Sequence, residues 1–242
     1  MIELARAAAR FVLPSDCLAC GRHPVDRFFD GGVCAACWQT LPAREAERCQ
    51  RCDETLPGTA EPSVCGRCLL DPPDFDALRA PAPYAGSARE ILLAFKFRGA
   101  DYLGARLSDV MLERLPRPEA AEIVCVPATA RARRARGYHP AEVLALALSR
   151  RLDIPFARRR LVKLRETEVQ SRLPLSQRAA NVRRAFRAAG RPAENVLLVD
   201  DVATSGATAR ECARRLAQAG ALRVTVWCFA RASRADAAPE AA

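Results

Sequence analysis

The sequence predicts an α/β domain, built on a mainly parallel sheet with helices on its flanks, after a small cysteine-rich module. From residue 77 onward, short apolar runs typical of buried strands alternate with segments of helical periodicity. Before that point, eight of the 11 cysteines form C-x2-C pairs, and a Pro-Pro pair between Asp71 and Asp74 then breaks the pattern. We therefore expect the first module over residues 1–73, the α/β domain over 74–231 and a disordered tail over 232–242.

The first half of the α/β domain begins with an edge strand. Pro81 and Pro83 confine this strand to an edge of the sheet, because proline has no N–H for a central ladder. Gly99 supplies a stop for the helix that follows. The predicted order is a strand over 77–84, helices over 87–97 and 102–115, a buried strand over 123–127 and a helix over 138–152.

The second half continues the alternation around one long polar segment. Residues 164–175 have no periodicity, and a loop of this size inside a compact domain is typical of a lid. At the other end of the chain, residues 2–13 have apolar positions at helical spacing and predict a short amphipathic helix rather than a secretion signal. The remaining elements are a strand over 159–164, a helix over 176–186, a buried strand over 196–199, a helix over 208–219 and a final apolar strand over 222–230.

The composition favours a polyanionic partner. The formal net charge is +10 and the isoelectric point is near 9.4, which suits phosphorylated ligands, nucleic acid, or both. No stretch approaches the ~20 apolar residues that a membrane span needs. We therefore expect a cytoplasmic protein with no membrane span.

The cysteine pairs predict two structural zinc ions. A C-x2-C knuckle directs two thiolates at one metal, and two knuckles complete a tetrahedral site. Iron in the same geometry is a minor alternative, and disulfides would need an oxidising compartment that nothing in the sequence supports. Sequential pairing is favoured because shorter loops close at lower entropic cost, although the first knuckle pairing with the third is an alternative. Sequential pairing gives one site from Cys17, Cys20, Cys34 and Cys37, and another from Cys49, Cys52, Cys65 and Cys68.

The other cysteines and the histidine inside this module have simpler expected roles. With every ligand position filled by sulfur, His23 is expected at the surface. The cysteines outside the knuckles fall within apolar strand or helix patterns, so they are expected to be small buried hydrophobic residues. These are Cys125, Cys212 and Cys228.

A strand, turn and helix near the carboxyl terminus carry the clearest chemistry. Asp200 and Asp201 follow the end of the apolar run, and small residues then lead into a helix. Backbone N–H groups at a helix start suit a phosphate, whereas two carboxylates suit sugar hydroxyls. Together they predict a ribose 5-phosphate site, because a turn that only caps its helix would not need two acids. The predicted phosphate-binding residues are Ala203, Thr204, Ser205, Gly206, Ala207 and Thr208.

The loop that follows the strand at 123–127 is expected at the same edge, because ligands bind at the carboxyl ends of parallel strands. Its forked guanidinium groups suit a pyrophosphate. A solvated basic loop or a nucleic-acid patch is the alternative for any one of these arginines. They are Arg131, Arg133, Arg134 and Arg136.

These motifs resemble known proteins. The segment from Asp200 to Thr208 resembles the signature loop of type I phosphoribosyltransferases, which implies that fold, with the two acids on the ribose hydroxyls of phosphoribosyl pyrophosphate and the loop on its 5-phosphate. Nearly the whole chain resembles the ComF family, which pairs a double zinc ribbon with such a domain. The motifs behind this second resemblance are the cysteine-rich start, Lys96-Phe-Arg-Gly99, Arg136-Gly-Tyr138 and the spaced residues Gln170, Leu173, Arg178, Asn181 and Phe186.

The resemblance implies a role in natural competence, the uptake of external DNA for transformation or as a nutrient. Single-stranded DNA and a competence motor or recombination protein are the implied partners, Lys96 an implied ligand-binding residue, and Mg²⁺ would arrive on the pyrophosphate. A salvage enzyme that makes nucleotides from free bases, and an interaction module with a vestigial site, are the alternatives. The family usually has Asn-Gln where this chain has His139 and Pro140, so we expect His139 to begin a helix rather than act as a catalyst.

Overall fold

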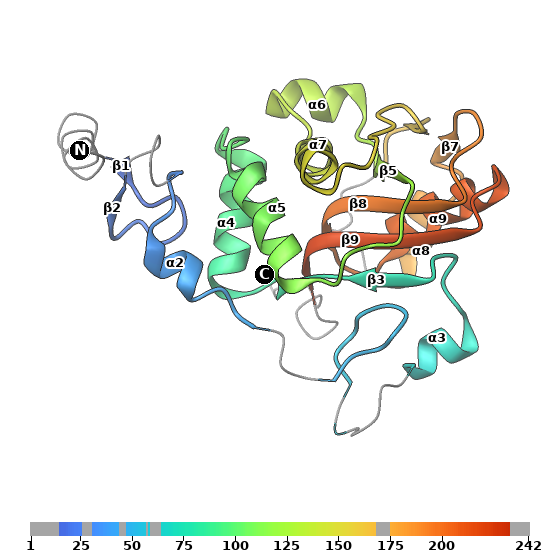
Figure 1. The fold of residues 1–242 in the computed structure, drawn as a ribbon, viewed down its shortest axis with the longest axis horizontal. Helices are drawn as coiled ribbons and strands as arrows, with labels where there is room; N and C mark the ends of the chain where they lie inside the picture. Colours follow the sequence, from blue (N-terminus) through green and yellow to red (C-terminus); the bar gives the residue numbers. More distant parts are fainter. Residues whose placement is uncertain are drawn as a thin grey trace.

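The computed structural model describes residues 15–25, 31–43, 47–56, 58, 64–167 and 175–232, without the side chains of 175 and 176 (Figure 1). The predicted helix over 2–13, residues 168–174 of the predicted lid and residues 233–242 of the predicted tail lie outside the described residues. Ala232, the first residue of that predicted tail, is described: it is buried, and its amide donates to the Ala203 carbonyl (2.9 Å).

Within the described residues, the α/β domain contains a five-stranded sheet whose pairings are all parallel. This confirms the predicted mainly parallel fold. The order along the sheet is β3-β9-β8-β5, and β4 pairs with β9 after β3 has ended, so the predicted edge strand is divided in two. The strands are β3 (Ala77–Arg79), β4 (Ala82–Pro83), β5 (Glu122–Cys125), β8 (Asn195–Ala203) and β9 (Arg223–Arg231).

Helices cover both faces of this sheet, as Figure 1 shows. Successive strand residues point to opposite faces, so Trp227 and Phe229 of β9 pack in one hydrophobic cluster and Val226 and Cys228 in another. Within the α/β domain, the first cluster takes its helical residues from α4 (Gly86–Phe97), α5 (Leu103–Arg114) and α7 (Pro140–Leu152). The second takes them from α8 (Leu175–Val182) and α9 (Ala207–Gln218).

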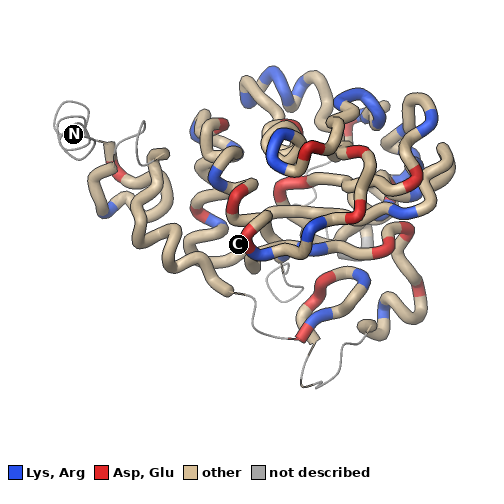
Figure 2. Tube along the Cα trace, in the orientation of Figure 1, with Lys and Arg blue, Asp and Glu red and all other residues tan. Residues whose placement is uncertain are grey.

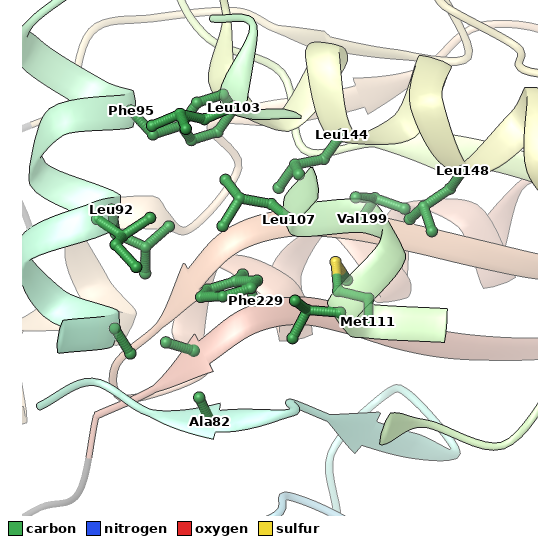
Figure 3. Packing of buried hydrophobic residues seen from close by; sticks show 14 of the residues in the cluster. Ala82, Leu92, Phe95, Leu103, Leu107, Met111, Leu144, Leu148, Val199 and Phe229 are labelled. Atoms are coloured by element: carbon green, nitrogen blue, oxygen red, sulfur yellow. The ribbon is translucent and has the colours of Figure 1, made fainter. Parts of the chain in front are cut away.

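Figure 3 shows the core on the first face of the sheet. Fully buried aliphatic and aromatic side chains from three helices meet Val199 of β8 and Phe229 of β9. Each such side chain contributes about 1.5–3 kcal/mol relative to exposure. This packing fixes the last turn of α4 relative to β8. The helical residues are Leu92 and Phe95 of α4, Leu103, Leu107 and Met111 of α5, and Leu144 and Leu148 of α7.

The arginine-rich segment after β5 is a helix, α6 (Ala130–Arg136), so the prediction of a loop there was wrong. Thr129 caps its start, where its hydroxyl accepts from the Ala132 amide (3.2 Å), and Gly137 ends it in the left-handed conformation at φ 80°. These are the ordinary signals for a helix start and stop. They outweigh the repulsion among neighbouring arginines.

Two further predictions need correction. β8 continues through Ala203, so Asp200 and Asp201 lie inside the strand and not after its end. The helix predicted over 176–186 ends at Val182, and β7 (Phe186–Ala188) follows it. This strand pairs antiparallel with β6 (Leu161–Lys163), which confirms the strand predicted over 159–164.

The cysteine-rich region consists of short elements. β1 (Ser15–Asp16) and β2 (Pro24–Val25) pair antiparallel, and α2 (Ala35–Gln39) and α3 (Gly66–Leu70) each begin directly after a cysteine. A region of this size cannot bury much apolar surface of its own, so its stability must come from metal and from packing on the sheet domain. Among the helices of the described segments, none has the length and apolarity that a membrane crossing requires.

Candidate functional site

Asp200 and Asp201 lie near the carboxyl end of β8, where the strand passes into a turn and then into α9. The Asp201 amide donates to Oδ1 of Asp200 (2.9 Å), and the Val202 amide donates to Oδ1 of Asp201 (2.7 Å). Both carboxylates are thus fixed against the backbone at the edge of the sheet where ligands bind in open α/β folds.

Lys96 reaches this edge from the last turn of α4. Its Nζ lies 3.1 Å from Oδ1 of Asp201, and both side chains are largely buried, at 17% and 14% exposure. An ion pair withdrawn from water in this way is screened less by salt than a surface pair. The structure therefore brings Lys96 together with the acids, as expected for a shared ligand site.

The two acids influence each other strongly. Burial, reinforced by the neighbouring Asp201 carboxylate, raises the pKa of Asp200 to about 8, although Lys96 opposes the shift. Two adjacent carboxylates resist ionising together without a cation or a hydrogen-bond donor between them. Sugar hydroxyls are such donors, so the arrangement is suited to a vicinal diol.

The turn between β8 and α9 depends on Gly206. This residue is the N-cap of α9 and has φ 77°, a left-handed conformation that glycine adopts without strain. The Ser205 hydroxyl accepts from the Ala207 amide (3.3 Å), which closes the turn. All six predicted phosphate-binding residues lie in the strand end, the turn and the first turn of α9, and those after Ala203 have their N–H groups near the positive end of the helix dipole.

Two arginines that the sequence analysis missed hold this turn. Arg67 of α3 donates to the Ser205 carbonyl through Nη1 (3.4 Å) and Nη2 (3.3 Å). Arg231 at the end of β9 donates through Nη1 to the Ala203 carbonyl (3.2 Å). Nothing local in the sequence distinguishes Arg67 from other surface arginines, because its partner lies 138 residues away.

The arginines of α6 are divided among several contacts. Arg133 pairs with Glu142 (Nη2 to Oε2, 3.2 Å), and the Arg136 guanidinium lies 5.2 Å from the centre of the Phe97 ring. Arg131 and Arg134 are exposed. The helix thus forms a basic surface, visible as a run of blue positions in Figure 2. Among the described residues, none of these four arginines forms an ion pair with Asp200 or Asp201.

A cavity of about 570 Å³ lies between α6, the start of α7 and β6. Arg133 is the one predicted ligand residue among its lining residues. Lys163, which no sequence motif indicated, also lines the cavity, and its Nζ donates to the Thr167 hydroxyl (2.8 Å). Burial lowers the pKa of Lys163. Five cationic side chains and two carboxylates are among the lining residues, and this excess of positive charge suits an anionic group: Arg133, Arg158, Arg159, Lys163 and Arg165 against Glu142 and Glu166.

The cysteines of the knuckles form two clusters, in the sequential pairing that was favoured. Within each cluster the four sulfur atoms lie within 4.8 Å of one another. Sulfur pairs are 3.8 Å apart for Cys17 and Cys37 and 3.6 Å apart for Cys52 and Cys65. Four sulfurs at about 2.3 Å from one zinc ion are about 3.8 Å apart, whereas a disulfide needs about 2.05 Å. Both clusters therefore fit a structural zinc ion.

In each cluster backbone amides lower the pKa of one thiol, whereas burial raises the pKa of two others, Cys34 and Cys37 in the first cluster and Cys52 and Cys68 in the second. The pKa of Cys20 is lowered to about 6, and the hydrogen bond from the Arg22 amide is the largest cause. Burial would raise the pKa of Cys49, but the amides of Cys52 and Cys65 outweigh it and hold the value near 7. Thiolates are the form that binds zinc.

The remaining histidines and cysteines agree with their expected roles. His23 is exposed, and His139 is the N-cap residue of α7 with Pro140 at the first helical position. Burial lowers the pKa of His139, which packs against Glu142 (3.6 Å). The cysteines outside the two clusters are buried in the hydrophobic core: Cys125, Cys212 and Cys228.

Comparison with known proteins identifies the family. Residues 8–69 match the family described as double zinc ribbon domain. The chain is 30% identical over 211 residues to DNA utilization protein YhgH of Escherichia coli (strain K12), which covers 83% of this chain and 90% of that protein. It is 29% identical over 214 residues to Competence protein F of Haemophilus influenzae, at 83% and 91% coverage. The chain belongs to the ComF family.

Membership of the ComF family accounts for the order of the parts, with the two cysteine clusters before the sheet domain. The departure of this chain from the family pattern, at His139 and Pro140, falls at the start of α7. Proline is well suited to a first helical position because its missing N–H would have no partner within the helix. The His139-Pro140 pair thus changes how α7 begins and does not add a ligand-binding group beside the two acids.

Proposed function

We propose that this ComF-family protein binds phosphoribosyl pyrophosphate or ribose 5-phosphate at Asp200, Asp201 and the loop 203–208, and that it acts in natural competence and DNA uptake. The observation that supports the ligand most directly is the meeting of two acids, Lys96 and a helix start at one edge of a parallel sheet. Carboxylates and a helix N-terminus side by side need a ligand with both hydroxyls and a phosphate.

Each part of the site has a role in this proposal. Asp200 and Asp201 accept from the ribose hydroxyls, and the turn at Gly206 surrounds the 5-phosphate with N–H groups. Mg²⁺ arrives on the pyrophosphate oxygens, as it usually binds phosphates. The cavity beside Arg133 and Lys163 offers cations for the pyrophosphate.

The role in DNA uptake is supported by the relatives and by charge. The relatives are named DNA utilization protein and Competence protein F. The net charge of +10 and the exposed arginines of α6 suit the phosphates of single-stranded DNA, and Phe97, which is 62% exposed, offers a ring on which a base can stack. A competence motor or recombination protein is the expected protein partner. Because the clusters need free thiols, we place this action in the cytoplasm.

Titration calorimetry of the zinc-loaded full chain with phosphoribosyl pyrophosphate and Mg²⁺ tests the ligand site. We expect saturable binding by the native chain and none by Asp200→Ala with Asp201→Ala, because the ribose loses both acceptors. Asp109→Ala, which removes a partly exposed acid on α5, is the control and keeps binding. No heat from the native chain at millimolar ligand would refute the site. Release of pyrophosphate with any of a panel of bases would reveal a transferase.

Fluorescence anisotropy with a labelled single-stranded oligonucleotide tests the DNA arm. Arg131→Ala with Arg134→Ala should weaken binding roughly 10-fold. The slope of log affinity against log salt concentration should become shallower by about one to two, because one or two phosphate contacts are lost. The matched control is Arg187→Ala with Arg223→Ala, which removes two exposed arginines from β7 and β9. Equal losses in both double variants would show that net charge alone, and not α6, attracts the DNA.

A further inference from the structure

The second cysteine cluster contacts the phosphate-binding turn directly. Arg67 lies between Cys65 and Cys68, inside the knuckle that supplies two of the four sulfurs. Both terminal nitrogens of its guanidinium approach the Ser205 carbonyl, at 3.4 and 3.3 Å. One carbonyl in the middle of the turn is therefore held by a residue whose backbone position depends on the metal site.

Arg231 makes a second connection between the same two places. Its Nε donates to the Cys52 carbonyl (3.2 Å), its Nη2 to Glu54 (2.9 Å) and its Nη1 to the Ala203 carbonyl (3.2 Å). The residue is only 2% exposed. A buried guanidinium with these partners is rigid, because any displacement would leave a buried charge without hydrogen bonds.

α9 and the core add further contacts. Arg210 of α9 forms an ion pair with Asp71 at the end of α3, and its Nη2 donates to the Asp71 carbonyl (2.6 Å). The cysteines of this cluster also pack in the hydrophobic cluster that contains Ala203 and Ala209. The start of the turn, its middle and the helix after it thus all touch the second cluster or its knuckles.

The first cysteine cluster is placed differently. Its region contacts α4 and α5: Ser87 of α4 donates to the Thr40 carbonyl (3.0 Å), Arg98 just after α4 to the Leu18 carbonyl (2.8 Å) and Arg114 of α5 to the Leu41 carbonyl (3.4 Å). In the part of the chain that the structure describes, no hydrogen bond joins the region of the first cluster to residues 203–207. The two clusters therefore support different sides of the molecule.

The contact with Ser205 has a consequence for the ligand. A trans peptide is planar, so its N–H points away from its C=O. When Arg67 holds the Ser205 carbonyl toward α3, the Gly206 N–H is turned to the opposite side. Arg67 thereby sets the direction of a donor that a phosphate would use at the start of α9.

We propose that the second zinc site helps to form the sugar-phosphate site. Arg67 is the positioning residue: bound metal fixes its knuckle, and its side chain then holds the turn in the conformation that binds the phosphate. This inference rests on the proposed function, since it assumes that a sugar phosphate binds there. Binding of metal and of ligand are then linked, and linkage is reciprocal: each raises the affinity of the other by the same factor.

Calorimetry with ribose 5-phosphate on the zinc-loaded full chain provides the first test. Arg67→Ala should bind roughly 5- to 20-fold more weakly than the native chain, in the lower part of the usual range for coupling between sites. Arg51→Ala changes an exposed arginine between Cys49 and Cys52 of the same cluster and should bind normally. Both variants should retain two zinc ions by metal analysis, so that loss of metal does not explain the difference. Equal affinity of Arg67→Ala and the native chain would overturn the proposal.

Zinc release to a coloured chelator gives a second test, which needs no variant for its main result. Ribose 5-phosphate should slow the release of one of the two ions from the native chain and leave the other unchanged, and Arg67→Ala should lose this protection. If ribose 5-phosphate binds but protects neither ion, the linkage is wrong while the ligand site stands. If neither ribose 5-phosphate nor phosphoribosyl pyrophosphate binds the native chain, the proposed function fails and the linkage fails with it.

Discussion

At the scale of single residues, Asp200 lies in an environment that is unfavourable for its own charge. Its burial beside Asp201 raises its pKa from the ordinary 3.8 to about 8. Burying a carboxyl group in this position lowers the stability of the fold, because burial opposes ionisation of the group at neutral pH. A ligand that donates hydrogen bonds to the pair would remove the conflict, so the strain is consistent with a binding role.

We predict that Asp200→Asn stabilises the ligand-free protein in a pH-dependent way. The native state keeps the proton of Asp200 between about pH 4 and pH 8, where the unfolded chain has released it, so the free energy of unfolding falls as pH rises through this range. Asparagine has no proton to lose. Urea denaturation at pH 5 and pH 8 should therefore show the variant gaining at least about 1 kcal/mol over the native chain at the higher pH.

The control for this prediction is Asp109→Asn, which changes a partly exposed acid paired with Arg151. Comparing each variant with the native chain at the same pH cancels the effect of acid on the zinc thiolates. A difference between Asp200→Asn and the native chain that is equal at both pH values would contradict the burial argument.

The acids and the arginine that supports their turn differ in how far the sequence could predict them. Asp200 and Asp201 were predicted because local order suffices, with an apolar strand before them and a small-residue turn after them. Arg67 was not, since it looks the same in sequence as Arg51 in the preceding knuckle. Only tertiary folding brings one of them to Ser205.

At the scale of secondary-structure elements, the ends of some strands and helices differ from the predicted ends, because pairing with a neighbouring strand or capping by a flanking residue determines them. The apolar run of β8 ends at Val199, but β9 pairs with the strand as far as Ala203 and Arg231, so the ladder carries β8 past its two acids. In α6, Thr129 and Gly137 were correct helix signals that the charge of the segment concealed. Hydrophobic pattern predicts the existence of an element better than its ends.

We predict that Gly104→Ala disrupts the packing of α5 on α7. A Cβ at this position would lie 2.3 Å from Cγ1 of Val143, which is far inside contact distance. Overpacking costs about 1–3 kcal/mol, and the better helix propensity of alanine returns about 1 kcal/mol of this. Urea denaturation should therefore show a net loss of up to about 2 kcal/mol.

A double-mutant cycle tests the cause of that loss. In a Val143→Ala background the side chain that obstructs the new Cβ is gone, so Gly104→Ala should become neutral or slightly stabilising. If the substitution is equally harmful with and without Val143, contact between these two helices is not the reason.

At the scale of the whole molecule, the cysteine-rich region and the sheet domain share their cores. Cys17, Cys34 and Cys37 pack in the hydrophobic cluster on one face of the sheet, and Cys49, Cys52 and Cys68 in the cluster on the other. The boundary predicted at residues 73 and 74 stays a prediction. Sequence could foresee the metal sites from spacing alone, but not that the two sites would support opposite faces, because this depends on how the chain runs between them.

The pairing of the knuckles leads to a prediction about metal content. The native chain should contain two zinc ions by metal analysis after gel filtration, and Cys17→Ser with Cys20→Ser should contain one. Adding Cys49→Ser and Cys52→Ser removes half of each observed cluster, so this fourfold variant should contain none, since two thiolates are not a closed site. Under the interleaved alternative the same four cysteines form one site, and one ion would remain. A fourfold variant that retains one ion would therefore contradict the sequential clusters and, with them, the separate support of the two faces of the sheet.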